Sequence, residues 1–393
     1  MMVQTWALLV DAYRELNAKK MFWIVLILTG VVLAGFATLG VSGNQMTVLW
    51  YAPFGKVPSA LFMYKAIFSY LVVGFWFTWV AVLLALISTA GIFPDFLSAG
   101  SIDLFLAKPI TRLRLFLTKY VAGLLFVLLQ VTFFAVASFV ILGVRAGVWQ
   151  PGIFWSIPII LVFFSYLYGV CVLLGVLTRS TVAALLLTLL AWLGFWAVDR
   201  VDVVMASYIN SQHATQADME DELARIDKEI AANPGAATQP ATERMGEEMY
   251  RDRVQIGSPP PGVGTRGSGS GETLEDQRAE AVSMRDEAVV SPTVEMVERV
   301  VVGVKTLIPK TRETTNLLDR ELFTDKDLRA ATQADAGQAS QQDEFERRRA
   351  ERRGQVWIDA MRERSVWWVV GTSVGFEAVV LGVAAWLFCR RDY

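Results

Sequence analysis

The stretch 104-LFLAKPITRLRLFLTKY-120 lies between two of the most apolar parts of the chain. It places Lys108, Pro109, Arg112 and Lys119 close together, although the residues on both sides carry almost no charge. A basic, proline-interrupted segment between two long apolar runs is typical of a loop that joins membrane-spanning helices on the side where Lys and Arg collect. The stretch therefore indicates a membrane protein.

The composition agrees with this interpretation. Of 393 residues, 54% are hydrophobic, including 13 Trp and 23 Phe, which is unusual for a soluble domain. Residues 199–365 hold 32 of the 38 acidic side chains, so the rest of the chain is almost free of carboxylates. The net charge of −2 gives no indication of a nucleic-acid partner. Only Cys171 and Cys389 are present, which excludes a disulfide framework, and no Cys/His cluster suits zinc.

Six apolar runs are long enough for transmembrane helices, because a bilayer core of about 30 Å needs about 20 apolar residues. They are Met21–Gly40, Phe68–Phe93, Phe116–Val144, Ile153–Leu177, Thr181–Val198 and Val366–Phe388. The first run is longer than the roughly 7–15 residues of a signal-peptide core and is therefore read as a retained span.

The distribution of Lys and Arg predicts the orientation of these spans. Most basic residues near the spans fall on one side of the membrane: before span one, between spans two and three, between spans four and five, and after span six. This distribution predicts cytoplasmic termini in a multi-pass cell (inner) membrane protein. Residues 199–365 are then extracytoplasmic. Five arginines between 347 and 353 oppose this rule, but long loops translocate largely regardless of charge, so the prediction is kept.

Within the basic loop, a short helix is predicted from about Ile102 to Ala107. Ser101 can cap its start, and Pro109 stops it because the residue before proline avoids helical dihedral angles. Such a helix is too short to be stable alone. It either docks on another protein or rests on lipid headgroups with its basic residues toward phosphate.

The residues of this loop resemble those of type-2 ABC exporter permeases. In that family a glycine, an acidic residue and a Leu-rich helix lead to a Lys-Pro-x-x-Arg turn and then to Lys-Tyr or Lys-Phe. The corresponding residues here are Gly100, Asp103, Leu104–Leu106, Lys108, Pro109, Arg112, Lys119 and Tyr120. The end 386-WLFCRRDY-393 resembles the family's closing Phe-x-Arg-Arg-Asp, and Trp6–Leu16 resembles its amphipathic connecting helix. One departure is 96-FLSAG-100, where relatives often carry Glu.

The resemblance implies a membrane half-transporter that works with a separate ABC ATPase, so ATP and magnesium would bind the partner chain and this chain would not be an enzyme. The absence of a G-x-x-x-x-G-K-[ST] phosphate loop agrees with this. It also implies a dimer with a second copy or a related permease. The residues expected to couple to the ATPase are Gly100, Asp103, Leu104, Leu106, Lys108, Pro109 and Arg112.

The last span contains a carboxylate. Glu377 lies near the middle of 366-VWWVVGTSVGFEAVVLGVAAWLF-388, where a charge is unfavourable in lipid and should face protein or water. Two roles are open for Glu377, with Ser373 one turn below it: a transport-path or proton-linked site, or a hydrogen-bonding residue between helices. Gly371 and Gly375 form a G-x-x-x-G pair on which another helix can pack.

The segment 199–365 is predicted to be helical and partly disordered. Apolar residues recur at helical spacing between 219 and 230 before Asn233–Pro234, and further helices are expected at 273–289, 292–308 and 341–364. The helix 292–308 has Val294, Val297, Val301, Val304 and Ile308 on its apolar side, and together with the following residues is expected to pack against the membrane. No residue pattern suggests catalysis.

The resulting prediction is an all-α membrane protein with four parts. Residues 1–20 form an amphipathic connecting helix, and 21–198 hold spans one to five with a cytoplasmic coupling loop at 94–115. Residues 199–365 form the extracytoplasmic insertion, which could bind an extracytoplasmic partner, and 366–393 form span six and the tail. The alternative function is a membrane-anchored sensor or scaffold whose insertion binds a partner.

Overall fold

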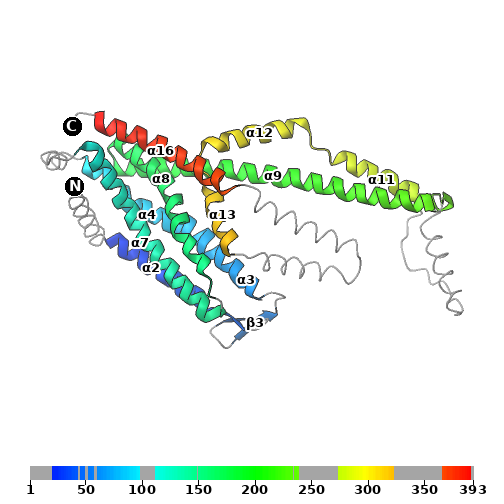
Figure 1. Ribbon diagram of the computed structural model, residues 1–393, viewed down its shortest axis with the longest axis horizontal. Helices are drawn as coiled ribbons and strands as arrows, with labels where there is room; N and C mark the ends of the chain where they lie inside the picture. The colour runs from blue at the N-terminus through cyan, green and yellow to red at the C-terminus, as the bar shows by residue number, and fades with distance from the viewer. Residues whose placement is uncertain are drawn as a thin grey trace. The chain divides into compact units, whose positions relative to one another are not determined.

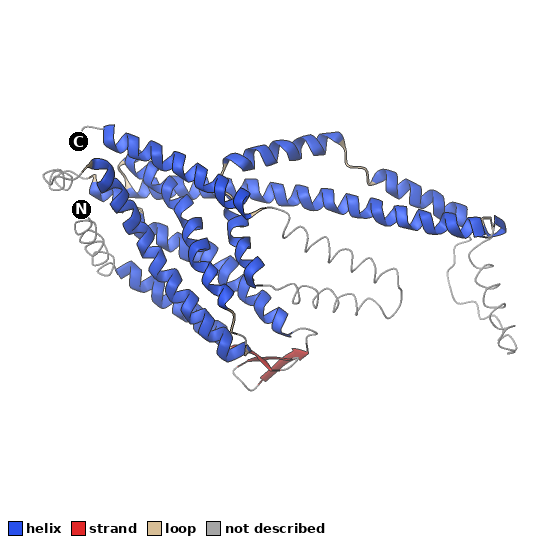
Figure 2. Cartoon of the chain, viewed as in Figure 1, coloured by secondary structure: helices blue, strands red, loops and turns tan. Residues whose placement is uncertain are grey.

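The computed structural model describes residues 20–42, 45–48, 52–56, 60–97, 111–147, 149–232, 234–238, 273–322 and 365–390. In these ranges the chain is almost entirely helical and has one small sheet (Figures 1 and 2). It divides into two compact units, one formed by residues 1–200 and 302–393 and the other by residues 201–301.

Five described helical segments are long and apolar enough to cross a membrane: Tyr64–Phe96, Arg112–Arg145, Pro151–Thr178, Thr181–Ala232 and Val366–Arg390. They coincide with predicted spans two to six. The predicted first span is the apolar helix α2 (Lys20–Ala37), whose 18 residues extend about 27 Å, slightly less than a bilayer core. The described chain thus has the character of a helical multi-pass membrane protein.

A three-stranded antiparallel sheet follows α2, a small feature of an otherwise helical chain that the sequence analysis did not predict. Its strands are β1 (Leu39–Ser42), β2 (Gln45–Val48) and β3 (Ala52–Lys56), in the order β1-β2-β3. β-branched residues such as Thr47 favour extended backbone, and Pro53 is tolerated because β3 is an edge strand. Arg145 holds β1 to the helical bundle by donating to the carbonyls of Thr38 and Leu39 at 2.8 and 2.9 Å.

The predicted second span is a composite of four helical elements. They are α3 (Ala60–Ile67), the π-helix η1 (Phe68–Ala81), α4 (Val82–Thr89) and α5 (Ile92–Phe96). A π-helix of 14 residues is uncommon, since most are single-turn bulges. Phe68, Trp76 and Phe77 of η1 are buried, with the Phe77 ring centroid 4.0 Å from that of Phe134, whereas Tyr70 and Phe75 are exposed.

The centre of the bundle is α8 (Ser156–Thr178), which follows the short 3₁₀ helix η2 (Pro151–Trp155). It packs against α7 (Arg112–Ala146), α16 (Val366–Arg390) and α13 (Thr311–Leu322) (Figure 1). The helices α7 and α8 can approach each other closely because a small residue of one faces a large residue of the other. A Cβ on Gly123 of α7 would collide with the ring of the fully buried Tyr168 of α8.

Because consecutive spans alternate in direction, the bundle has two ends. At one end, α5 stops, α7 begins and α16 stops, and we name it the loop end. At the other, α7 stops and α16 begins, and we name it the insertion end.

Helix α9 (Thr181–Ala232) is longer than predicted. The fifth span and the helix expected before Asn233 form one helix of 52 residues, because no Gly or Pro interrupts the chain between Gly194 and Pro234. The prediction that this helix ends before Asn233–Pro234 is confirmed.

The unit formed by residues 201–301 contains two of the predicted helices. The second half of α9 packs against α11 (Leu274–Glu287) through Ile226 and Leu274, and Arg278 forms an exposed ion pair with Asp227 at 2.7 Å. Thr273 and Asp276 form a capping box that fixes the start of α11. The short η3 (Pro234–Ala236) also lies in this unit.

Helix α12 (Pro292–Leu307) forms where it was expected, but its apolar side is not buried in the described chain. On the predicted apolar side, Val297 and Val304 are exposed and Val294, Val301 and Ile308 are half-buried; Met296, Val300 and Leu307 beside it are 58–76% exposed. The buried residue of α12 is instead Lys305. The expected helices at Trp6–Leu16, 102–107 and 341–364 lie outside the described residues.

Candidate functional site

Aromatic rings bring three separate chain segments together at the loop end. Phe96 ends α5, Phe116 lies in the second turn of α7, and Phe388 lies near the end of α16. The Phe388 ring centroid is 6.0 Å from that of Phe96 and 5.6 Å from that of Phe116, and Phe93 lies 5.0 Å from Phe116. All four side chains are at most 5% exposed. The basic loop is anchored by the end of α5 before it and the start of α7 after it. Both anchors therefore pack in one apolar cluster with the C-terminal helix α16.

Polar contacts connect the same segments. Arg112, the first residue of α7, donates to the Cys389 carbonyl at 3.2 Å, one of the last carbonyls of α16, which have no partner inside their own helix. Lys119 lies over the Phe96 ring at 5.9 Å. Thr111 stands at the N-cap position, but its side chain makes no capping hydrogen bond. We name these contacts, with the aromatic cluster, the loop-end cluster.

Of the residues predicted to couple to an ATPase, Arg112 is the one that the structure describes. Gly100, Asp103, Leu104, Leu106, Lys108 and Pro109 lie outside the described residues. The structure therefore shows how the loop is held at both ends.

A second site lies inside the bundle, at Glu377 of α16. Its Oε1 accepts a hydrogen bond from the Tyr120 hydroxyl of α7 at 2.6 Å, and its Oε2 lies 2.8 Å from the Ser165 hydroxyl of α8. The Tyr120 ring stacks on Tyr168 at 5.2 Å, and a Cβ on Gly169 would lie 3.8 Å from the Glu377 side chain. Three helices thus converge on one carboxyl group, and one of them contributes Tyr120 of the Lys-Tyr motif.

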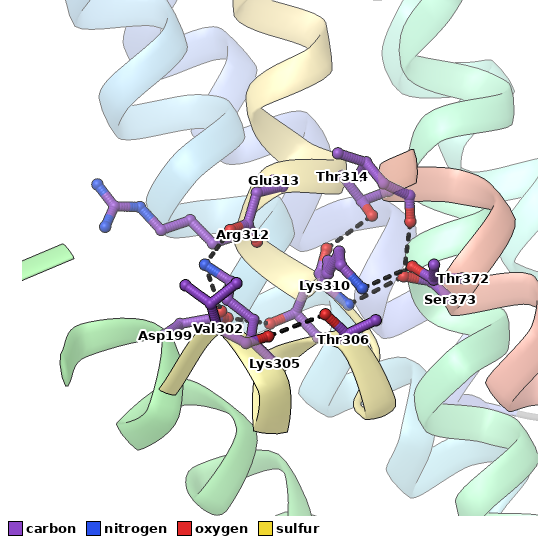
Figure 3. A network of polar contacts seen from close by, with 12 residues as sticks. Asp199, Val302, Lys305, Thr306, Lys310, Arg312, Glu313, Thr314, Thr372 and Ser373 are labelled. Carbon is purple, nitrogen blue, oxygen red and sulfur yellow. Dashed lines mark hydrogen bonds and ion pairs between the residues drawn. The ribbon is translucent and has the colours of Figure 1, made fainter. Parts of the chain in front are cut away.

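A third site, shown in Figure 3, is a buried charge cluster at the insertion end. Lys305 of α12 is 1% exposed, and its Nζ lies 3.3 Å from the Asp199 carboxylate of α9 and forms an ion pair with Glu313 of α13. Thr311 donates to Asp199 at 3.0 Å. One buried ammonium between two carboxylates therefore holds α9, α12 and α13 together.

Ser373 belongs to the same region. Its hydroxyl accepts a hydrogen bond from the Lys310 backbone N–H at 3.0 Å, while Lys310 Nζ bonds Thr372 (Figure 3). Lys310 Nζ also lies 4.2 Å from the centre of the Trp368 ring. Ser373 and Glu377 thus lie on one helix but bond different partners: Lys310, which directly precedes α13, for Ser373, and residues of α7 and α8 for Glu377.

Gly371 and Gly375 do not contact another helix of the described chain. A Cβ added to either would find no atom within 4 Å, apart from its own helix and neighbours. Their role in helix packing therefore stays a prediction that concerns another molecule. In the described ranges, no group of three or more His, Cys, Asp or Glu residues could hold a metal ion.

With this geometry established, the chain can be compared with known proteins. No family model, curated protein or solved structure matches it. The function must therefore be argued from the residues themselves.

Sequence reasoning missed the charge cluster and the partners of Glu377. Two signals were present: Asp199 and Arg200 directly follow an apolar run, and Lys305 interrupts a valine-rich helix. Neither reveals that Asp199 and Lys305 meet, because their pairing depends on how the chain returns to the bundle after more than 100 residues.

Proposed function

We propose that this chain is the membrane subunit of an ATP-driven ABC exporter of the cell (inner) membrane. ATP and magnesium would bind a separate ATPase chain, and a second copy or a related permease would complete the transporter. The loop 94–115 would dock on the ATPase through Gly100, Asp103, Leu104, Leu106, Lys108, Pro109 and Arg112. Hydrolysis would then drive export of a substrate or act on an extracytoplasmic partner.

The observation that carries this proposal is the loop-end cluster. A loop that passes motion from one protein to another must be firmly attached to the elements it moves. Both anchors of the basic loop pack on Phe388, and Arg112 also bonds the end of α16. A displacement of the loop would therefore be transmitted to α5, α7 and α16 together. The residues that meet here are also those of the two motifs that resemble the exporter family.

The alternative is a membrane-anchored sensor or scaffold whose residues 199–365 bind a partner. A scaffold needs one span, whereas this chain has five described helices able to cross a membrane. A scaffold also gives no reason for a buried aromatic cluster that joins the basic loop to the last span. We therefore prefer the exporter.

The test uses the tagged full-length chain purified from its native membranes. We expect magnesium-dependent ATP hydrolysis to co-purify with the wild type and to be lost in the double variant Leu104→Asp, Leu106→Asp, because charges on the docking helix prevent its burial in an apolar groove. Membrane insertion and detergent melting should be unchanged.

A matched control places two Asp residues on exposed apolar positions of another part of the chain, Met284→Asp with Val289→Asp, which are 45% and 61% exposed. This variant should retain the co-purifying activity. A wild type that carries no ATPase chain, or a loop variant with full activity, would contradict the proposal.

A further inference from the structure

One face of α16 is not covered by the rest of the described chain. Val379, Val383, Trp386 and Arg390 follow one another at spacings of four, three and four residues, so they share one side of the helix. The three apolar side chains are 67%, 44% and 55% exposed, and Arg390 is exposed at the helix end. A Cβ on the adjacent Gly382 would meet no atom within 4 Å, apart from its own helix and neighbours. We name these four residues the Trp386 face.

The opposite side of α16 holds the helix in the bundle. Ala384 and Phe388 are at most 2% exposed, and Phe388 belongs to the loop-end cluster. The fold of the monomer therefore does not require the Trp386 face to be covered. Because α16 is long and apolar enough to cross a membrane, the hydrocarbon chains of lipids are the natural neighbours of this face.

The ring and the cation at the end of the face form a pair. The guanidinium carbon of Arg390 lies 5.0 Å from the centre of the Trp386 ring. Trp is enriched where the hydrocarbon of a bilayer meets the headgroups, and Arg near the end of a span extends toward that boundary. A guanidinium presents five N–H donors in one plane, which match the oxygen atoms of a phosphate group. The pair thus combines a group that binds phosphate with an apolar strip.

The charges near Arg390 are mainly positive. In the described residues the loop end carries the carboxylate of Asp95 on α5 and six cations: Lys20, Arg112, Arg114, Lys119, Arg179 and Arg390. Arg112 bonds the Cys389 carbonyl, so a second guanidinium lies beside the residue that precedes Arg390. Such a surface attracts anionic lipid headgroups. It disfavours a second copy of this chain packed side by side in the same orientation, because that copy would bring the same positive charges to the contact.

We propose that the Trp386 face binds one anionic phospholipid. The guanidinium of Arg390 donates hydrogen bonds to the phosphate oxygens, and an acyl chain lies along Trp386, Val383 and Val379. A zwitterionic phospholipid has the same chains and the same phosphate, but the cations of the loop end repel its ammonium group. The site therefore selects lipids by net charge, and it does not depend on the proposed ATPase partner.

The experiment is native mass spectrometry of the full-length protein in detergent, titrated with phosphatidylglycerol or with phosphatidylcholine of the same acyl chains. We expect the wild type to bind phosphatidylglycerol more tightly. Arg390→Gln should weaken this binding about fivefold, the effect of one cation near a lipid headgroup, and should change phosphatidylcholine binding less. The matched control is Lys20→Gln, which removes an exposed cation of the loop end from α2 and should keep most of the preference.

Four results would overturn the proposal. Equal binding of the two lipids by the wild type would show that the face does not select an anionic headgroup. Equal losses in Arg390→Gln and Lys20→Gln would mean that only the overall charge of the loop end matters. Displacement of the lipid by excess glycerol phosphate would show that the acyl chain has no part in binding. A dimer that Trp386→Ala dissociates would show that a second copy covers this face.

Discussion

At the scale of single residues, the bundle depends on glycines that face large side chains. Gly123 of α7 lies against the ring of Tyr168, which is 1% exposed and cannot move outward. Gly371 of α16 is a helical glycine with no such neighbour. The two positions have the same helical environment and differ in what covers them.

Gly123→Ala should therefore destabilise the protein by about 1–3 kcal/mol, the usual effect of overpacking a close contact. Gly371→Ala should be neutral or slightly stabilising within the monomer, since alanine favours helix and its methyl group meets nothing. The measurement is thermal unfolding of both variants in the same detergent. Equal melting temperatures would show that α7 and α8 are less tightly packed than the structure indicates.

The residue-scale contacts also explain what sequence patterns cannot predict. Glu377 is noticeable because it is a carboxylate in an apolar run, and the pattern correctly marks it as a residue that needs polar partners. Its partners Tyr120 and Ser165 lie 257 and 212 residues away in the chain, so they become evident only when the helices are packed.

At the scale of elements, most helices follow from local patterns, and the exceptions have identifiable causes. The apolar runs predict the spans, the Asn233–Pro234 signal predicts the end of α9, and α11 and α12 form within about two residues of the ranges expected for them. The sheet and η1 were not predicted. Strands of four or five residues are too short for a clear alternation, and the hydrogen-bond pattern of a π-helix leaves no trace in composition.

The buried charge cluster is an element-scale feature because it joins α9, α12 and α13. Lys305→Met should destabilise the protein by about 3–5 kcal/mol, since it leaves the buried Asp199 and the partly buried Glu313 without their cation. The triple variant Lys305→Met, Asp199→Asn, Glu313→Gln should recover much of this loss, because it removes all three charges together.

Chemical unfolding in detergent measures both variants. The control is Arg278→Ala, which removes the exposed ion pair with Asp227 and should have little effect, because solvent screens such pairs. A Lys305→Met protein as stable as wild type would mean that the two carboxylates gain protons or water instead of depending on the lysine.

At the scale of the whole molecule, the orientation in the membrane is the prediction on which the coupling role depends. In a background without Cys171 and Cys389, Ser270→Cys should react with a membrane-impermeant maleimide in intact cells, whereas Ser101→Cys should not. The reason is the excess of Lys and Arg on the side of the basic loop.

Permeabilised cells provide the control, since both cysteines should react there. The reverse pattern in intact cells would place the loop-end cluster outside and remove the basis for an ATPase partner. Labelling of both positions in intact cells would indicate mixed insertion, as the arginines between 347 and 353 would then compete with the basic loop.

Because of the ion pair between Asp199 and Lys305, the membrane bundle should accept other domains inserted in place of residues 201–301. These residues stand just outside the two ends of the compact unit 201–301, and both belong to the bundle. They keep the chain's exit and return points close together regardless of what is inserted between them. A short linker in place of 201–301 should therefore let the spans assemble, so that this unit can be exchanged or enlarged as a module without redesign of the bundle.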